Sequence, residues 1–312
     1  MTINSHLTEF GGLPVAVFDA ETDPETAELP PAASRAWRVD LSSGWQEEKV
    51  TPAVLDRFTG AVDSTAVTHL IMGHWGIQEY GDPTPVEVLT AAADRFPALR
   101  ALFLGDIVME EREISWIEQC DITPLFAAFP GLETLEVRGA EDLGLKPVRA
   151  ERLKRLRFES GGLPGQVVRG IAACDFPALE HLDLWLGTEN YGGNATVDDL
   201  APILSGERLP SLRHLGLEDS EIQDEIAAAV AAAPIVARLE SLSLAMGTLT
   251  DRGAESLLSG QPLTHLASLD LSHHYMTPAT ADRLRAALPG VKVDVGDGQD
   301  PDDDWPYVAI AE

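Results

Sequence analysis

Residues 212–217 read LRHLGL, residues 239–244 read LESLSL and residues 266–271 read LASLDL. In each segment a leucine is followed by two variable positions, a second leucine, one variable position and a third leucine. An apolar residue then follows after four further variable positions, at Ile222, Leu249 and Met276. Apolar residues two positions apart lie on the same face of a β-strand. Each segment therefore predicts a short strand whose leucines face a common core.

The same spacing recurs upstream in the chain. Three copies keep all four apolar positions and two keep only the first three, and these five copies begin at Val67, Leu99, Leu153, Leu132 and Leu179. Between copies the apolar spacing changes to that of a helix, with start signals such as Thr277-Pro278. Eight copies of one pattern are a specific signal for a repeat protein.

The alternation of strand and helix segments defines the expected fold class. Strands separated by helices are expected to be parallel and joined by crossovers. One strand–helix unit cannot bury both of its apolar faces, and stacking against neighbouring units supplies the missing contacts. The sequence therefore predicts an α/β solenoid shaped like a horseshoe, with parallel strands on the concave face and helices on the convex face.

This pattern resembles the leucine-rich-repeat superfamily over about residues 67–295, and the last repeats resemble its ribonuclease-inhibitor-like type. The segments GDI (105–107), EISWI (113–117) and LETLEVRG (132–139) also resemble an uncharacterised group of bacterial cytoplasmic repeat proteins. The resemblance implies a fold and a cytoplasmic location, and it brings no known activity.

The ends of the chain differ from its middle. We expect an N-terminal cap over residues 1–50, a solenoid over residues 51–295 and an acidic C-terminal tail over residues 296–312. Exposed terminal repeats need such covering. Residues 305–310 are apolar enough to fold back onto the last repeat.

Composition restricts the partners that the chain is expected to bind. Lys and Arg total 22 against 51 Asp and Glu, which gives a formal net charge of −29. Such a surface repels phosphate backbones and anionic headgroups, so neither nucleic acid nor a membrane is an expected partner. We interpret the acidity as a means of solubility in preference to steering toward a basic partner. Two cysteines, no signal peptide and no apolar run of spanning length indicate a reducing cytoplasm.

No catalytic motif is present in the sequence. It contains no GxSxG, GxxxxGK[ST] or HExxH motif, and no GxGxxG follows a strand. Cys120-Asp121, His273-His274 and the acidic run at Glu110, Glu111 and Glu113 are better explained as structural or solvated residues. We therefore expect a non-enzymatic protein with no cofactor and no metal ligands.

Charged and aromatic residues occupy the variable strand positions expected on the concave face. The predicted partner-binding residues there are Glu136, Arg138, Arg155, Arg157, Glu159, His181, Asp183, Trp185, His214 and Glu218. The three arginines form a basic island that either binds a carboxylate-bearing partner or pairs with Glu136 and Glu159. Both interpretations stay open at this point.

Three insertions after strands carry aromatic residues, which are enriched at binding hot spots. They contain Trp75, Tyr80, Trp116, Trp185 and Tyr191. We predict an aromatic rim formed mainly by the first and third insertions, so Trp75 and Tyr191 join the partner-binding set. Trp116 is expected to pack in the core.

The sequence thus favours a non-catalytic scaffold that binds a protein partner through the concave face and an aromatic rim. The alternative is an enzyme or small-ligand-binding protein with a site in the insertions around Glu110, Glu111, Asp183 and Trp185. A third possibility is a regulator of an enzyme encoded beside it.

Overall fold

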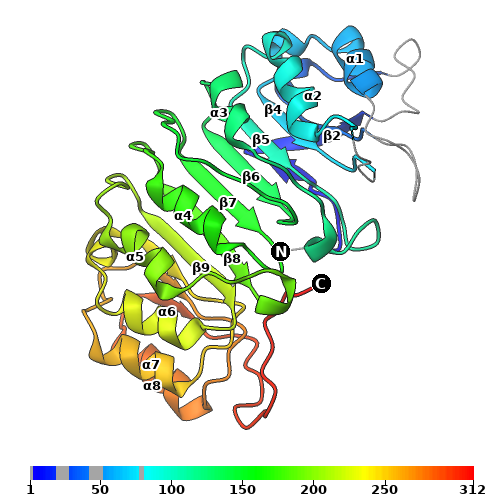
Figure 1. Ribbon diagram of the computed structural model, residues 1–312. Coiled ribbons are helices and arrows are strands. Elements are labelled where there is room, and N and C mark those ends of the chain that lie inside the picture. Colours follow the sequence, from blue (N-terminus) through cyan, green and yellow to red (C-terminus); the bar gives the residue numbers. More distant parts are fainter. Residues whose placement is uncertain (1–2, 19–27, 42–51, 77–80) are drawn as a thin grey trace.

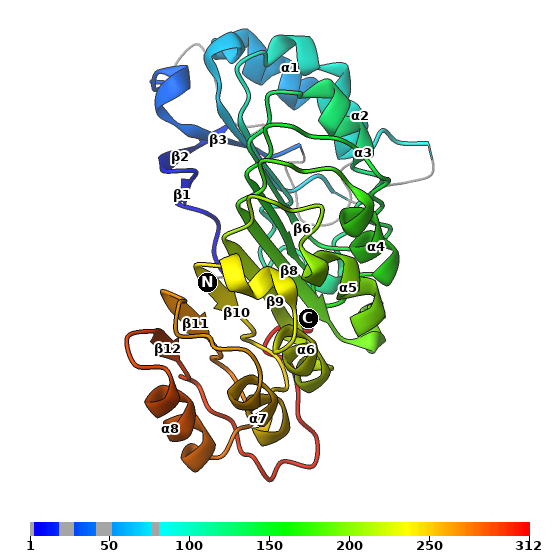
Figure 2. The same cartoon turned by 90° about the vertical axis from the view of Figure 1, so that its left-hand side faces the viewer.

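The chain coils into one curved solenoid, seen in a computed structural model that describes residues 3–18, 28–41, 52–76 and 81–312 (Figure 1). Strands line its inner surface and helices cover its outer surface in both views (Figures 1 and 2). The strands of the described residues are β1 (Glu9–Phe10), β2 (Leu13–Phe18), β3 (Ala36–Val39), β4 (His69–Met72), β5 (Ala101–Leu104), β6 (Thr134–Arg138), β7 (Arg155–Glu159), β8 (His181–Gly187), β9 (His214–Ser220), β10 (Ser241–Ser243), β11 (Ser268–Asp270) and β12 (Lys292–Asp294).

These strands form one sheet in chain order, and neighbours are parallel except for the antiparallel pair β1–β2. The α-helices are α1 (Pro52–Ala61), α2 (Pro85–Ala91), α3 (Thr123–Ala128), α4 (Gly165–Ala173), α5 (Val197–Ser205), α6 (Gln223–Val230), α7 (Asp251–Ser259) and α8 (Pro278–Ala287). The predicted α/β leucine-rich-repeat solenoid is confirmed. In the described part of the chain, the helices are all too short or too polar to span a bilayer.

The leucines of successive repeats stack in register beneath the sheet. Leu182 pairs with Leu215, Leu215 with Leu242, and Leu242 with Leu269. All four side chains are almost completely buried within one continuous core. Removing a leucine side chain from water contributes about 1.5–3 kcal/mol. Each repeat is therefore held by its neighbours along the same apolar spine.

Threonine side chains set several of the helix starts. Thr277 accepts a hydrogen bond from the Thr280 amide and is followed by a proline in the first turn of α8, as the sequence indicates. Thr196 and Asp199 form a reciprocal capping box at the start of α5. Such caps satisfy backbone N–H groups that have no partner within the helix. These caps determine the residue at which the loop after the strand ends and the helix begins.

The N-terminal segment covers the concave face at one end of the sheet. Phe10 packs edge-to-face on Phe103, with ring centroids 5.9 Å apart, and edge-to-face on His69 at 6.0 Å. Phe10, Ile71 and Phe103 belong to a second small apolar cluster on this side of the sheet. The concave surface over β4 and β5 is therefore occupied by the chain itself, and open surface remains farther along the solenoid.

The C-terminal segment runs back along the edge where the strands end. Residues 307–311 form hydrogen bonds in turn with Tyr275, Met246, Asp219 and Ser115. The segment thus passes beyond the last repeat, onto which it was expected to fold, and reaches the loop after β5. The division into cap, solenoid and tail at residues 50 and 295 stays a prediction.

Candidate functional site on the concave face

The predicted concave residues come together on four adjacent strands, β6 to β9. Strand register places Glu136 opposite Arg157 and Arg138 opposite Glu159 on the neighbouring strand. Arg157 in turn lies opposite Asp183, because β7 and β8 pair with the same alternation. Opposite charges directly across a strand pair stabilise the sheet. The repeat register therefore builds a network of alternating charge.

The three arginines of the basic island pair with glutamates of the same network. Arg138 Nε lies 2.7 Å from Glu159 Oε2, and Arg157 Nη2 lies 3.0 Å from Glu159 Oε1. Arg155 Nε donates to Glu136 Oε1 at 2.8 Å. The interpretation as paired arginines, left open by the sequence, is the one that the structure supports. Of the three, Arg155 is the most exposed, with 36% of its side chain accessible.

Burial and neighbouring charge act against each other within this network. Burial raises the pKa of Glu136, and Arg155 and Arg157 lower it by a smaller amount. Burial alone would lower the pKa of Arg157, but Glu159 and Glu136 raise it above its usual value. A buried charge is tolerated only when it is paired and hydrogen-bonded. These residues accordingly hold one another in fixed positions.

Trp185 lies beneath the surface of the network. It is 1% exposed, its indole Nε1 donates to Glu218 Oε2 at 2.9 Å, and the Arg157 guanidinium lies 5.3 Å from the centre of its ring. Glu218 also accepts a hydrogen bond from Ser243. The expectation that Trp185 forms part of an exposed rim is therefore wrong, because its ring packs with the apolar core and is covered by Arg157 and Glu218.

His181, Asp183 and His214 form a second cluster beside Arg155. The two imidazole rings stack with centroids 3.9 Å apart and planes 10° from parallel. His181 Nε2 lies 2.5 Å from Asp183 Oδ2, and His214 Nε2 lies 2.7 Å from Asp183 Oδ1. Burial opposes ionisation of Asp183, but the hydrogen bonds from both histidines lower its pKa far below the usual range. One carboxylate thus receives two imidazoles from neighbouring repeats.

Gly216 gives the Asp183 carboxylate room between the strands. The two residues follow His181 and His214 at equivalent positions of adjacent repeats, HLDLW at 181–185 and HLGLE at 214–218. A Cβ at position 216 would lie 2.3 Å from Asp183 Oδ1. A side chain there would displace the carboxylate from the histidines.

The network continues toward the N-terminal end of the solenoid. Arg138 Nη1 lies 3.6 Å from the fully buried Asp106, which is also 3.6 Å from Arg38 Nε. Arg38 and His6 both approach Glu111. Burial would lower the pKa of His6, but its contacts with Asp106 and Glu111 raise it to about 9.

The alternative site in the insertions does not assemble as proposed from the sequence. Glu111 contacts His6 and Arg38, whereas Asp183 contacts the histidines of β8 and β9. Glu110 is exposed. The carboxylates of this alternative therefore belong to separate clusters and do not converge on one pocket.

The aromatic residues of the insertions also depart from expectation. Trp75 is 1% exposed and lies in the core, so its assignment to a rim is wrong. Trp116 was expected in the core, but it is 49% exposed and packs edge-to-face on Tyr191, with centroids 6.2 Å apart. Tyr80 lies outside the described residues. A Trp116–Tyr191 pair therefore replaces the rim predicted at this edge.

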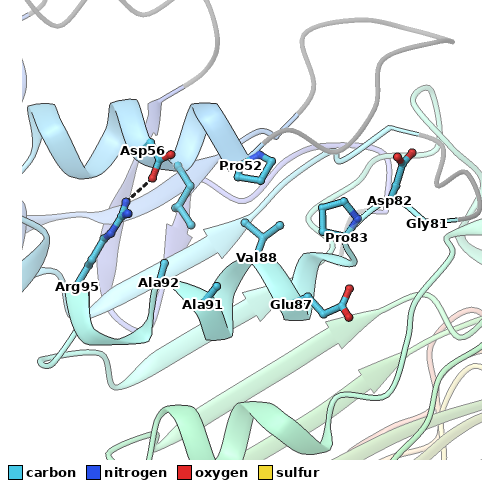
Figure 3. Close-up of a pocket in the computed structure, with 11 residues that line it drawn as sticks. Pro52, Asp56, Gly81, Asp82, Pro83, Glu87, Val88, Ala91, Ala92 and Arg95 are labelled. Atoms are coloured by element: carbon cyan, nitrogen blue, oxygen red, sulfur yellow. Dashed lines mark hydrogen bonds and ion pairs between the residues drawn. The ribbon is translucent and has the colours of Figure 1, made fainter.

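A hollow of about 680 Å³ lies on the other side of the molecule, between α1 and α2 (Figure 3). At one end Asp56 and Arg95 point toward each other and form an ion pair. Glu87 accepts a hydrogen bond from the Thr84 amide and caps α2. These charged groups serve the local structure, so the concave face remains the better candidate site.

No protein-family model and no curated protein sequence matches the chain significantly. Among solved structures, a protein from Bacteroides fragilis, determined as a structural-genomics target, aligns over 86% of this chain and 76% of its own, with 30% identity and a TM-score of 0.76. The chain belongs to the same family as this Bacteroides fragilis protein. A TLR13–ssRNA13 complex aligns over 84% of this chain and 33% of the TLR13 chain, with 16% identity and a TM-score of 0.45.

Sequence reasoning named every residue of the concave network on β6–β9 but missed how His181, Asp183 and His214 converge. The signal was present in the matched positions of HLDLW and HLGLE, which place two histidines in register. The three residues can meet only because Gly216 stands at the position equivalent to Asp183 in the next repeat and leaves room for the Asp183 carboxylate. Asp106 and Arg38, which extend the network, were also missed. Arg38 precedes the first copy of the repeat, and Asp106 occupies a variable position after the last strand leucine of the copy that begins at Leu99.

Proposed function

We propose that this protein is a non-catalytic scaffold that binds a protein partner on the concave surface over β7 to β11. The observation that carries the proposal is a row of half-exposed polar side chains on adjacent strands, each at the first position of its strand: Arg155, His181, His214, Ser241 and Ser268. The N-terminal segment covers the corresponding surface at β4 and β5, so this stretch is the open one.

Neighbouring side chains hold the half-exposed polar residues of this row in fixed positions. Arg155 is held by Glu136, and His214 contacts both Asp183 and Ser241. Side chains that are already ordered lose little entropy when a partner binds. The surface therefore offers several oriented hydrogen-bonding groups that a protein partner can match.

The expected compartment is the cytoplasm, a proposal supported by the sequence resemblance and by Cys120 and Cys174, which are both free. The proposed absence of catalysis rests on the missing sequence motifs and on the mutual pairing of the concave charges.

The test is a capture experiment from lysate of the source cells with two matched double variants. Arg155→Ala with Ser268→Arg alters the concave row, and Arg169→Ala with Ser259→Arg makes the same changes on the exposed helices α4 and α7. We expect the concave variant to lose a specific partner that the wild type and the helix variant retain. Retention of the same partners by the concave variant would contradict the proposal.

A further inference from the structure

The cluster at His181, Asp183 and His214 has the composition of a transition-metal site. Neutral imidazole nitrogens and a carboxylate are ligands that zinc and its neighbours in the first transition row accept, and two histidines with one carboxylate recur in such sites. The three ligand atoms all lie within 4.8 Å of one another. We propose that this cluster binds one divalent transition-metal ion, with zinc as the representative ion.

The distances are compatible with metal binding after a small movement. The two nitrogen–oxygen separations are 2.5 and 2.7 Å. A tetrahedral zinc with bonds of about 2.1 Å holds its ligand atoms about 3.4 Å apart. The histidine nitrogens therefore need to move away from the Asp183 oxygens by less than about 1 Å. The two rings are stacked and nearly parallel, so each must also rotate to aim its Nε2 lone pair at one ion, a movement open to side chains that are 24% and 21% exposed.

The surroundings of the ligands favour the form that coordinates metal. Ser241 Oγ lies 2.7 Å from His214 Nδ1, where it can accept a hydrogen bond from that nitrogen. In the metal-free cluster the Nε2–H of His214 donates to Asp183. When an ion replaces that proton, the hydrogen bond from Nδ1 to Ser241 stabilises the tautomer in which Nε2 presents its lone pair to the ion.

The ion can also reach the site. The side chains of His181 and His214 are 24% and 21% exposed on the open part of the concave face. With three protein ligands, a fourth position remains for water or for a donor group from a bound molecule.

Arg155 is the principal feature that opposes a cation here. Its Nη2 lies 3.7 Å from Asp183 Oδ2. However, the same guanidinium is held by Glu136, and on β6–β9 the three arginines face four carboxylates, Glu136, Glu159, Asp183 and Glu218. The formal charge of −29 on the whole chain also attracts cations. The local field therefore does not exclude a divalent ion.

The proposal is tested by titrating zinc into the metal-stripped full-length chain by isothermal calorimetry, with cobalt absorption as a second readout. We expect saturable binding of one ion per chain, and at least a tenfold loss of affinity in His181→Gln and in His214→Gln. His265→Gln is the matched control, because His265 is exposed and lies outside the cluster, and its affinity should equal that of the wild type. Far-UV circular dichroism and the melting temperature verify that each variant is folded.

Gly216→Ala provides an independent variant that keeps all three ligand side chains. Its Cβ would lie 2.3 Å from Asp183 Oδ1 and should displace the carboxylate. We again expect at least a tenfold loss of affinity. Ser241→Ala should weaken binding by about 10- to 100-fold, the usual effect of losing a hydrogen bond to a ligating histidine.

Two results would overturn the proposal. If the wild type shows no saturable zinc binding, the cluster is only a hydrogen-bonded arrangement of two histidines around an aspartate. If the cluster variants bind zinc as tightly as the His265→Gln control, the ion sits on the acidic surface elsewhere. Because no protein partner is present, neither result bears on the proposed scaffold function.

Discussion

Replacement of Trp185 by phenylalanine tests whether this tryptophan supports the concave network from below. The change removes the indole N–H that donates to Glu218 Oε2 at 2.9 Å and keeps most of the apolar ring. A hydrogen bond to a charged group contributes about 1.5–3 kcal/mol, and Glu218 is buried, so water cannot easily replace the donor. Ser243 still donates to the same carboxylate. We expect the free energy of unfolding to fall by about 2 kcal/mol.

Trp185→Ala measures how much the buried volume of the indole ring contributes to stability. Because Trp185 is 1% exposed, its truncation leaves a cavity, and such changes cost about 3–5 kcal/mol. Trp116→Phe and Trp116→Ala are the matched controls, since Trp116 is 49% exposed. Exposed replacements usually change stability by less than about 0.5 kcal/mol. Urea unfolding followed by far-UV circular dichroism measures all four variants.

The pH dependence adds a signature that is specific to the hydrogen bond. Burial raises the pKa of Glu218, and the nearby charge of Asp183 raises it further. The indole N–H stabilises the charged form of Glu218. The difference between wild type and Trp185→Phe should therefore be largest above the pKa of Glu218 and should shrink as the pH falls below it. Equal unfolding midpoints for Trp185→Phe and Trp116→Phe at neutral pH would refute the role assigned to Trp185.

Three further changes probe the spine, the N-terminal cover and a buried acid. Leu215→Ala should cost about 2–5 kcal/mol and accelerate amide exchange in the adjacent repeats, while unchanged exchange there would contradict mutual stacking. Phe10→Ala should cost about 3–5 kcal/mol and make the segment around it sensitive to protease, and an unaltered cleavage pattern would argue against that cover. Burial raises the pKa of Asp40 to about 6 despite Arg38, so the contribution of Asp40 to the stability of the wild type falls as the pH rises from about 4 to 6. Asp40→Asn should be more stable than wild type by about 3 kcal/mol at pH 8 and lose this advantage below about pH 4, as measured by urea unfolding at each pH; a variant less stable at pH 8 would contradict the assignment.

The fold could be predicted because the leucine pattern is local and repeats. Leu215, Leu242 and Leu269 occupy equivalent positions in LRHLGL, LESLSL and LASLDL, and their burial follows directly from strand periodicity. The same periodicity assigned the concave residues, since positions between buried leucines must face the other side of the sheet. The sequence therefore predicted that these residues share the concave face.

The repeat pattern did not predict which aromatic residues are buried. Trp75 lies beyond the end of β4, where the repeat pattern no longer states which side a residue faces. Trp185 lies within β8 on the concave side that the pattern assigns to it, but the pattern does not state how deeply a concave residue is buried. Trp185 is enclosed because Arg157 lies over its ring and Glu218 accepts its N–H, contacts that join three different repeats. Trp116 is exposed although it sits in an apolar segment, EISWI. Residues in the insertions have no equivalent positions in the other repeats, so their burial depends on tertiary contacts that the repeat pattern does not predict.

The sequence also failed to predict two other features, the N-terminal segment that covers the concave face and the His181–Asp183–His214 cluster. Both were missed for the same reason. Both depend on residues distant in the sequence meeting on one face of the sheet. Phe10 reaches Phe103 across several strands, and His214 reaches Asp183 because Gly216 leaves space for its carboxylate. Such meetings follow from register and shape rather than from a recognisable motif.

We propose that a partner binds the open concave surface over β7 to β11, and histidine labelling measures whether this surface is covered in the complex. Diethyl pyrocarbonate reacts with accessible imidazoles, and His181 and His214 are half-exposed on that surface while His265 is exposed outside it. With the metal-stripped chain and its captured partner, we predict that labelling of His181 and His214 is suppressed while His265 reacts as in the free chain. Unchanged labelling of His181 and His214 in the complex would show that the partner does not cover this surface.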